Sequence, residues 1–504
     1  MTKNHNSRRN HFFERLCKGG LLLSLAPLLL ASCAGDGFDD GERFISDVTN
    51  STLSSPDANE VTCTASADGK SQTITWKVVR GAGGYLFSFY DMANLDEPIV
   101  KDSLIDGCSV TVKREEDMNY RIDLRTKGNS ELNNQDATET TQVSISTFTP
   151  TYATIPAGSD LNEWFAANPI PETAVDEMLN YDLEGGSEYT LSDVLDFDGK
   201  RITLRSNNKT SHAKIVYTTA TSGITTTAQM NIKYLDFDCS GMTSTTGVFA
   251  FSKSTTVAAA NTIDPSKFKW SGAYIADPIT IVSCNFDNVG GYFFWDNQVK
   301  TWADNVLVDN CVVRLTPSAS VAGGVFWTNK AGQINNLTVN ACTFYEDPDW
   351  AFDYKYFYQA GMAKGPDLYV DNTSFSKAAT NSVNYTNSTF YHVTWNNGQW
   401  GNYNGMQSKT YSYWIMTDCI FFDCSTSGSV PRRFLHGRTN QPGAKFNNNT
   451  YMNADGTFQD PGSYDTSGTI IEEDPQFANP TAGDFTISGP TQVARKTGDP
   501  RWLP

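Results

Sequence analysis

Between Ile279 and Tyr451, short runs of alternating apolar and polar residues recur, and none of them has the period of an amphipathic helix. Short alternating strands that repeat about every thirty residues are typical of a β-solenoid, in which each repeat forms one turn. We therefore expect like positions of successive repeats to stack in one continuous core. The repeats are centred on Cys284, Cys311, Cys342, Thr373, Cys419 and Asn449, which are 27, 31, 31, 46 and 30 residues apart.

The cysteines of this repeat predict an inward ladder of thiols. Equivalent residues on stacked parallel strands lie about 4.8 Å apart, whereas the Cβ atoms of a disulfide lie about 3.8 Å apart. Cys284, Cys311 and Cys342 are therefore expected to be buried and unpaired. Cys63 and Cys108 lie outside the repeat, where a disulfide is possible, but we favour two buried thiols there as well.

Asparagine residues mark the expected bends of the solenoid, because asparagine tolerates a left-handed backbone and bonds its own main chain. They stand just before or inside the repeated pattern, at Asn310, Asn340, Asn372, Asn447, Asn448 and Asn449.

The segment 46–149 has a different pattern, with strand-like runs separated by turn residues such as Ala67-Asp68-Gly69. About six strands in about one hundred residues predict a β-sandwich. Trp76 and Tyr120 resemble the core residues of a fibronectin type III-like domain. We interpret this module as a spacer. Residues 150–182 are expected to be a linker with one short helix, Asp160–Ala167.

The residues after this linker resemble the opening rungs of right-handed parallel β-helix proteins related to pectate lyases. Residues 185–191 read Gly-Gly-Ser-Glu-Tyr-Thr-Leu, and residues 199–204 read Gly-Lys-Arg-Ile-Thr-Leu. Asp474-Pro-Gln-Phe477 and Gly498-Asp-Pro-Arg-Trp502 resemble the closing segment of such domains. The resemblance implies an all-β chain, with an N-terminal β-sandwich followed by a right-handed parallel β-helix whose halves are 183–345 and 346–504.

Composition agrees with this fold class and narrows the partners. Of the 504 residues, 12% are aromatic and 19% are charged, which suits a β-rich protein with a large core. The net charge of −18 argues against a nucleic-acid partner, because wrapping a nucleic-acid backbone needs a concentrated basic face.

The first residues have the features of a lipoprotein signal peptide at 1–32. Basic residues precede the apolar run 21–30, which is too short to span a bilayer. Leu30-Ala31-Ser32-Cys33 resembles a bacterial lipobox, which implies acyl chains on Cys33; the alternative is an ordinary cleaved signal with a chance cysteine. The acidic linker 33–45 resembles the surface-export tether of Bacteroidetes-type lipoproteins.

The order of lipobox, fibronectin-like module and β-helix resembles surface lipoproteins encoded with polysaccharide-uptake systems. This resemblance implies an outer-membrane protein that faces the cell exterior, binds polysaccharide and works with glycan-uptake machinery.

Two stretches expected to form outward loops combine flat rings with amides and carboxylates, at 344–356 and 395–404. Sugars need this combination, because rings stack on their C–H faces while polar groups meet their hydroxyls. The alternative is that the rings fill gaps beneath long loops. Alternation along the strands also turns either Trp327 and Tyr358 or Phe326 and Phe357 outward. The candidate sugar-binding rings are Trp327, Trp350, Tyr354, Tyr356, Tyr358, Trp395 and Trp400.

A basic stretch, Pro431–Arg438, is unusual in so acidic a chain. Phe326, Phe357 and Phe434 each follow a repeat cysteine by 15 residues, so this stretch is expected to be a strand of the same sheet. Arginine binds carboxylates in a bidentate manner, which suits an acidic polysaccharide such as pectin. Salt bridges to neighbouring turns are the alternative. The candidate side chains are Arg432, Arg433, His436 and Arg438.

The resemblance to pectate lyases implies one possible chemistry, in which arginine acts as the base beside calcium. Arg433 and Arg438 are the candidates for that base, although their spacing departs from the family pattern. Carboxylates suit Ca²⁺, and the four that could bind one ion are Glu346, Asp347, Asp349 and Asp353.

Three functions follow from these patterns. The first is a non-catalytic surface lipoprotein that binds polysaccharide, the second is a calcium-assisted lyase of pectate-lyase type, and the third is a structural or adhesin-like module.

Overall fold

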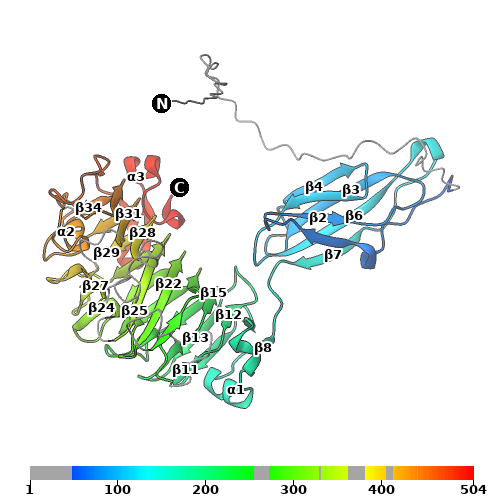
Figure 1. The fold of residues 1–504 in the computed structure, drawn as a ribbon. Helices are drawn as coiled ribbons and strands as arrows, with labels where there is room; N and C mark the ends of the chain where they lie inside the picture. Colours follow the sequence, from blue (N-terminus) through cyan, green and yellow to red (C-terminus); the bar gives the residue numbers. More distant parts are fainter. Residues whose placement is uncertain (1–47, 255–271, 329–330, 361–380, 404–411, 440) are drawn as a thin grey trace, which may run out of the picture. The chain divides into compact units, whose positions relative to one another are not determined.

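The computed structural model describes residues 48–254, 272–328, 331–360, 381–403, 412–439 and 441–504. The chain divides into two compact units, Met1–Thr147 and Phe148–Pro504. Both are built almost entirely of strands, and the predicted all-β class is confirmed (Figure 1). No helix in the described part of the chain is long and apolar enough to cross a membrane.

The first unit is the predicted β-sandwich. Trp76 lies in its core 6.5 Å from Phe87, and Phe89 stacks on Tyr120 at 4.6 Å. The first sheet contains β1 (Thr62–Ala65), β2 (Ser71–Thr75) and β5 (Ser109–Lys113); the second contains β4 (Val100–Ile105), β3 (Ala82–Asp91), β6 (Asn119–Gly128) and β7 (Thr141–Ser146). Two 3-10 turns, η1 (Ala58–Glu60) and η2 (Ser130–Leu132), flank these strands.

Cys63 and Cys108 are free thiols, as expected, but they are not both buried. Cys63 is exposed on β1, and Cys108 is half-buried. The expectation of two buried thiols is wrong, because every residue of β1 lies on the surface.

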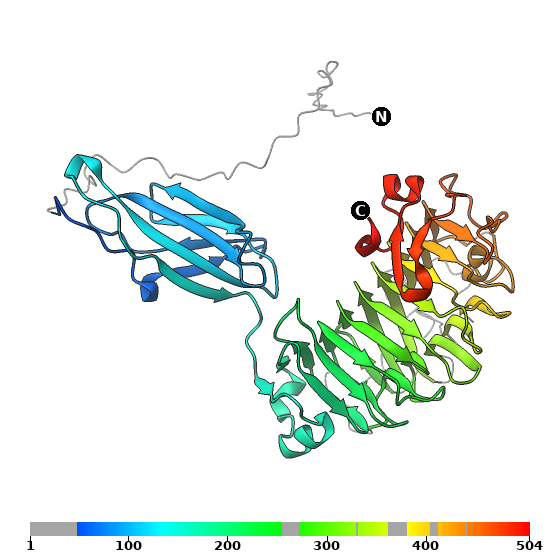
Figure 2. The ribbon, with the colours of Figure 1, turned by 180° about the vertical axis from the view of Figure 1, so that it is seen from behind.

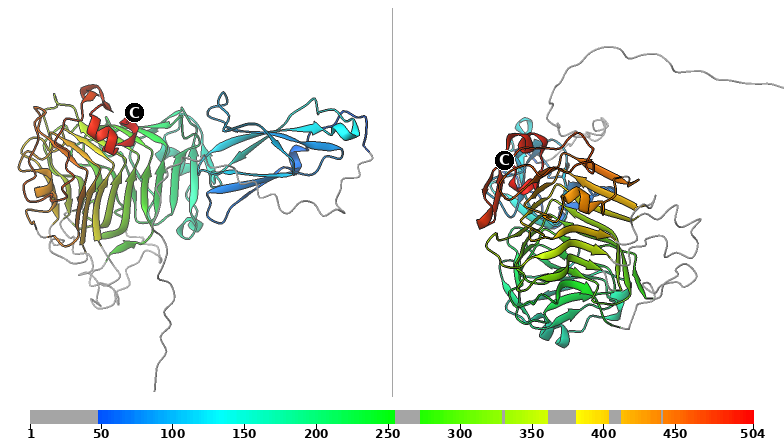
Figure 3. Two further views of the ribbon diagram at one scale, coloured as in Figure 1. Left: turned by 90° about the horizontal axis from the view of Figure 1, so that it is seen from above. Right: turned by 90° about the vertical axis from the view of Figure 1, so that its left-hand side faces the viewer.

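The second unit is the predicted parallel β-helix, in which three sheets run along the solenoid (Figure 3). Every strand pair in these sheets is parallel, and the central rungs contribute one strand to each sheet. The nine-stranded sheet contains β10 (Glu188–Leu191), β13 (Ala213–Tyr217), β16 (Leu235–Asp238), β20 (Asn285–Val289), β23 (Val312–Leu315), β26 (Thr343–Glu346), β29 (Thr389–Tyr391), β32 (Ile420–Phe422) and β34 (Thr450–Met452).

The other two sheets complete the rungs. The seven-stranded sheet contains β11 (Val194–Asp196), β14 (Gly223–Thr226), β17 (Gly247–Phe251), β21 (Tyr292–Trp295), β24 (Val321–Thr328), β27 (Tyr354–Ala360) and β30 (Gln399–Tyr403). The eleven-stranded sheet contains β8 (Ala153–Ile155), β9 (Leu179–Leu183), β12 (Ile202–Ser206), β15 (Met230–Lys233), β18 (Ala273–Ile275), β19 (Ile279–Val282), β22 (Thr301–Asp309), β25 (Gln333–Asn340), β28 (Asn381–Thr386), β31 (Ser412–Thr417) and β33 (Ala444–Asn447).

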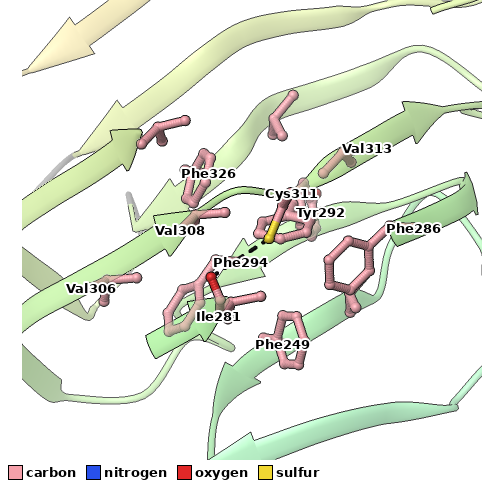
Figure 4. Close-up of a cluster of buried hydrophobic side chains, with 14 of the residues drawn as sticks. Phe249, Ile281, Phe286, Tyr292, Phe294, Val306, Val308, Cys311, Val313 and Phe326 are labelled. Carbon is pink, nitrogen blue, oxygen red and sulfur yellow. Dashed lines mark hydrogen bonds between the residues drawn. The ribbon is translucent and has the colours of Figure 1, made fainter. Parts of the chain in front are cut away.

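The cysteine ladder lies at the corner between the eleven-stranded and nine-stranded sheets. The backbone N–H of Cys311 donates to the Sγ of Cys342 at 3.4 Å, and that of Cys342 donates to the Oγ of Ser388 at 3.1 Å. The cysteines are buried and free, as predicted. Figure 4 shows Cys311 among the core rings Phe249, Phe286 and Phe326.

In each rung, the residue just before the ladder position has a left-handed backbone. Asn310 (φ 53°) and Asn448 (φ 49°) confirm the expected role of asparagine at this bend, and Ala341 and Asp418 occupy it in other rungs. Asn340 and Asn447 instead end strands β25 and β33, and Asn372 lies outside the described residues. Thr373, expected as a rung centre, lies outside the described residues. Because β25 pairs directly with β28, the position after Cys342 belongs to Ser388.

Residues 150–182 form the first part of the solenoid, not the linker that we expected. Strand β8 pairs with β9, which pairs with β12, so this segment extends the eleven-stranded sheet. The predicted short helix is present as α1 (Leu161–Ala167), capped by Asp160, and η3 (Glu172–Val175) follows it. Arg205, 1% exposed, fastens the segment by bonds to Asp182 and Thr149.

The closing segment returns over the outer face of the nine-stranded sheet (Figure 2). Asp499 accepts a hydrogen bond from Thr343 at 2.8 Å, and Phe485 packs edge-on against Tyr391 at 5.5 Å. The segment contains β35 (Phe477–Asn479), η6 (Pro480–Ala482), β36 (Asp484–Ile487), α3 (Pro490–Arg495) and η7 (Pro500–Trp502).

The basic stretch is a helix, not the strand that we expected. Helix α2 (Val430–Phe434) has a proline in its first turn, where the missing N–H costs nothing. It packs against β30 and takes the place of a further strand of the seven-stranded sheet. Phe434 is nevertheless in the core, 5.4 Å from Tyr385.

Candidate functional site

The strands of the seven-stranded sheet do not alternate strictly between core and surface. Strands β17, β21, β24 and β27 each place two adjacent residues in the core, and this explains why strict alternation failed to separate the inner from the outer rings. The inner pairs are Val248 and Phe249, Phe293 and Phe294, Val325 and Phe326, and Phe357 and Tyr358, all at most 1% exposed.

The residue after each inner pair lies on the outer face, and these residues stand in register from strand to strand. Trp295 pairs with Trp327 on the adjacent strand, and both indoles are half-buried. We call the set the outer row. It consists of Ala250, Trp295, Trp327, Gln359 and Asn402.

The two outer indoles are held in place by neighbouring residues. The ring of Tyr292, 5% exposed, lies 4.6 Å from the ring of Trp327 and 5.5 Å from that of Trp295. Gly323 leaves room for the Trp327 indole, because a Cβ there would lie 2.6 Å from the ring. The Lys253 ammonium lies over the Trp295 ring at 5.8 Å. The indoles are therefore fixed platforms with part of their surface open.

The outer row also carries amides. Gln359 and Asn402 are half-buried and pair with each other across β27 and β30. The Asn402 side chain donates to the hydroxyl of Tyr356 at 3.5 Å. Rings and amides therefore follow one another along a single line of the sheet.

Four of the candidate sugar-binding rings are buried. Tyr354, Tyr356, Tyr358 and Trp400 are 1%, 6%, 1% and 0% exposed. Trp400 stacks flat on Phe357 with ring centroids 4.5 Å apart. The expectation that these rings meet a ligand from outside is wrong for Tyr354, Tyr358 and Trp400, which point into the core. Tyr356 stands at the position of Tyr292, beside the outer row, but is almost fully covered.

Trp350 and Trp395 are half-buried at the corner between the nine-stranded and seven-stranded sheets. Trp350 donates from Nε1 to the carbonyl of Pro317 at 2.6 Å. Trp395 donates to Glu346 at 3.1 Å and stacks on His392 at 4.6 Å. The remaining candidate ring, Trp327, lies in the outer row.

The same corner holds a buried carboxyl pair, Glu346 and Asp353, that are 0% and 6% exposed. Burial raises the pKa of Glu346 well above its usual range, and the adjacent Asp353 adds to this effect. Burial also raises the pKa of Asp353 to about 6, although backbone N–H groups of Asn396 and Tyr354 donate to it. Both carboxyl groups therefore keep their protons to a higher pH than an exposed carboxyl group does.

The four carboxylates expected to bind calcium do not converge. Asp347 lies 3.8 Å from Arg314, and Asp349 is exposed, whereas Glu346 and Asp353 are inside the corner. Among the described residues, no three His, Cys, Asp or Glu side chains are arranged as a metal ion requires. These residues do not fit the calcium ion that the pectate-lyase resemblance implies.

The basic candidates surround α2, beside the last strand of the seven-stranded sheet. Arg432, His436 and Arg438 are exposed, and Arg433 is half-buried. Arg433 donates to the carbonyl and the hydroxyl of Ser427 at 2.6 and 3.1 Å. Partial burial, and then the nearby Arg432, lower the pKa of Arg433.

Sequence reasoning omitted Tyr292, Trp295, Gln359 and Asn402 from the site. The signal available for Trp295 was its register with Trp327, since both follow a glycine and an inner aromatic pair or its equivalent. The amides gave no such signal, because their outward placement depends on the double inward placement of the two residues before them.

Three domain families of unknown function match the chain in succession. They are DUF4992 over residues 7–186, DUF4957 over residues 187–347 and DUF5123 over residues 337–502. No curated protein matches the chain.

Solved structures with some likeness include proteins of both expected folds. An Fn3-like protein from Clostridium thermocellum has 13% identity and a TM-score of 0.15, over 20% of this chain and 96% of that chain. Pectate lyase PelI from Erwinia chrysanthemi, in complex with tetragalacturonic acid, has 10% identity and a TM-score of 0.21, over 71% and 88%. Pectate lyase Pel3 from Pectobacterium carotovorum has 10% identity and a TM-score of 0.20, over 60% and 80%.

Proposed function

We propose that this protein binds polysaccharide along the outer face of the seven-stranded sheet. The observation that carries the proposal is the in-register pair of half-buried indoles, Trp295 and Trp327. An indole stacks on the C–H face of a sugar ring, while amides such as those of Gln359 and Asn402 meet its hydroxyls.

We propose further that the ligand is an acidic polysaccharide. Helix α2 packs on β30, so a chain that followed the outer row past Asn402 would reach exposed Arg432 and Arg438. Guanidinium groups bind carboxylates through paired charge-assisted hydrogen bonds. Uronate residues of the polysaccharide would therefore bind at the α2 end, whereas both neutral and charged sugar residues would stack on the indoles.

The cellular setting belongs to the same proposal. Acyl chains on Cys33, outside the described residues, would hold the protein at the outer membrane, and the β-sandwich would act as a spacer. In this arrangement the β-helix faces the cell exterior, binds glycan and delivers it to glycan-uptake machinery.

A polysaccharide lyase is the second candidate function. The lowered pKa of Arg433 is the direction that a general base needs. Against this role, its guanidinium already donates to Ser427, and the four candidate carboxylates do not form one ion site. A structural or adhesin-like module is the third.

Affinity electrophoresis of the full chain separates these functions. Gels would contain pectate, neutral plant glycans or host glycans, and the absorbance of unsaturated uronate would be followed in parallel with calcium present. We expect retardation by pectate without a rise in absorbance. A calcium-dependent rise in absorbance would establish the lyase instead. If no gel retards the protein and the absorbance does not rise, both the binding protein and the lyase are overturned, and the structural module remains.

A further inference from the structure

The outer face of the nine-stranded sheet is divided into an apolar half and a charged half. In the later rungs, Tyr391 and Phe422 point outward, and Phe477 and Phe485 of the closing segment cover them. In the earlier rungs, the outward positions carry charged and amide groups. These are Lys214, Asp236, Asp238, Asn285, Asp287 and Arg314.

A groove of about 690 Å³ lies where the cover ends. Its floor is the charged half of the sheet, and one wall is the end of the closing segment, with Thr481, Arg501 and Trp502. Ligand sites typically have volumes of about 300–1,000 Å³. The groove is thus large enough for a small ligand, and it lies on a different sheet from the outer row.

The charges that line the groove balance. Arg314 lies 3.1 Å from Asp287, and Lys214 lies 3.6 Å from Asp238. Arg501 is fastened by Asp499 and by the carbonyl of Asn310. An ionic ligand would have to separate these pairs. A hydroxyl group would not, because it accepts from a cation and donates to a carboxylate at the same time.

The groove also offers a fixed aromatic wall. The indole of Trp502 is half-buried, and its Nε1 donates to Thr343 at 2.8 Å. Phe485 packs against it edge-on at 5.9 Å. An indole held in this way, opposite paired carboxylate and guanidinium groups, is the combination that binds a hydroxyl-rich ring.

We propose that this groove is a second carbohydrate site, specific for a neutral saccharide. It uses the Trp502 indole as the stacking surface and Asn285, Asp287 and Arg314 as the hydroxyl-binding groups. Its existence does not depend on the glycan site of the seven-stranded sheet.

Calorimetric titration of the full chain tests the proposal. The probes are neutral hexasaccharides of β-1,4-glucan, β-1,4-xylan, β-1,4-mannan and β-1,3-glucan, with hexagalacturonate for comparison. We expect at least one neutral probe to bind, and its affinity to fall at least tenfold when Asp287→Asn and Arg314→Gln are combined. The paired change Glu172→Gln with Lys200→Gln removes an ion pair outside the groove and should leave the affinity unchanged.

A second variant, Asn285→Ala, guards against a folding artefact, because Asn285 is exposed and its loss leaves the core intact. It should weaken the same neutral probe severalfold, whereas Trp295→Ala combined with Trp327→Ala should not. The proposal is overturned if no neutral probe binds, or if the groove variants bind it as tightly as the unaltered chain.

Discussion

The inner and outer surfaces of the seven-stranded sheet use aromatic residues for different purposes. Inside, Trp400 lies at zero exposure and stacks on Phe357, with Phe390 and Phe421 edge-on at 4.9 and 5.0 Å. Outside, Trp295 and Trp327 keep part of each ring open. A single strand can supply both kinds, as β21 does with inner Phe294 and outer Trp295, so composition alone does not separate a core ring from a binding ring.

The local backbone makes this separation. Because two adjacent residues of β17, β21, β24 and β27 enter the core, the outward positions fall three residues apart, as at Tyr292 and Trp295. The inner rings should therefore govern the free energy of unfolding, and the outer rings should govern ligand affinity.

The largest effect is expected from Trp400→Ala. The substitution leaves a cavity among stacked rings and should lower the free energy of unfolding by about 3–5 kcal/mol. No hydrogen bond is lost, since the indole Nε1 has no partner among the described residues. Denaturant unfolding of the full chain measures the change, with Trp295→Ala as the matched control. Equal stability of the two variants would contradict the division.

The next effect is expected from Asp353, at the corner between the nine-stranded and seven-stranded sheets. The pKa of Asp353 is raised to about 6, so the folded state favours the protonated carboxyl. This contribution is fully present below about pH 4 and is lost as the pH rises through about 6, which costs about 3 kcal/mol. Asp353→Asn should reduce the fall in stability between pH 4 and pH 7.5, and the remaining fall comes from Glu346, whose pKa burial also raises.

Thermal unfolding across that pH range measures the effect of Asp353→Asn. The exposed Asp349, three residues after Glu346 in the same turn, provides the control Asp349→Asn, which should keep the profile of the unaltered chain. If Asp353→Asn also keeps it, the buried carboxyl does not titrate as described.

A binding effect of about ten- to a hundredfold is expected from Trp295→Ala combined with Trp327→Ala. Each ring supplies stacking worth about 0.5–1.5 kcal/mol beyond its buried area. Retardation by pectate in affinity electrophoresis should be nearly lost, whereas unfolding should change little. Tyr413→Ala is the control, because this ring is 40% exposed on the eleven-stranded sheet. An equal loss of retardation with Tyr413→Ala would show that any exposed ring contributes to binding and that the outer row is not a specific site.

The smallest effect is expected from Arg432→Ala combined with Arg438→Ala. These exposed arginines should raise the affinity for uronate chains only severalfold, and this increase in affinity should vanish at high salt. Retardation by neutral glycans should stay unchanged. A similar loss of retardation with neutral and acidic glycans would mean that the helix α2 region does not distinguish charged from neutral ligands.

The sequence was sufficient for the repeat-driven features of the fold. Periodic spacing located the ladder of Cys284, Cys311 and Cys342, because stacking in a solenoid places like residues over one another. Thr373 lies outside the described residues, and the ladder position after Cys342 belongs to Ser388, because the long gap before Cys419 holds two stretches with the same local pattern. Periodic spacing also missed helix α2, where a proline in the first turn ended the strand pattern.

The candidate site was less predictable than the fold. Strict alternation predicts one outward residue in each adjacent pair, and the two inward residues of each strand break that rule at Phe357 and Tyr358. Of the two pairs that alternation could turn outward, only Trp327 reaches the outer face, and its neighbour Trp295 was not among the candidates. Backbone irregularities of this kind depend on packing across rungs, which a single strand does not reveal.

The most direct test of the central claim is a structure of the full chain with bound hexagalacturonate. Sugar rings should lie stacked over Trp327 or Trp295, with uronate carboxylates toward Arg432. A ligand found only elsewhere on the chain, with both indoles uncovered, would contradict this claim.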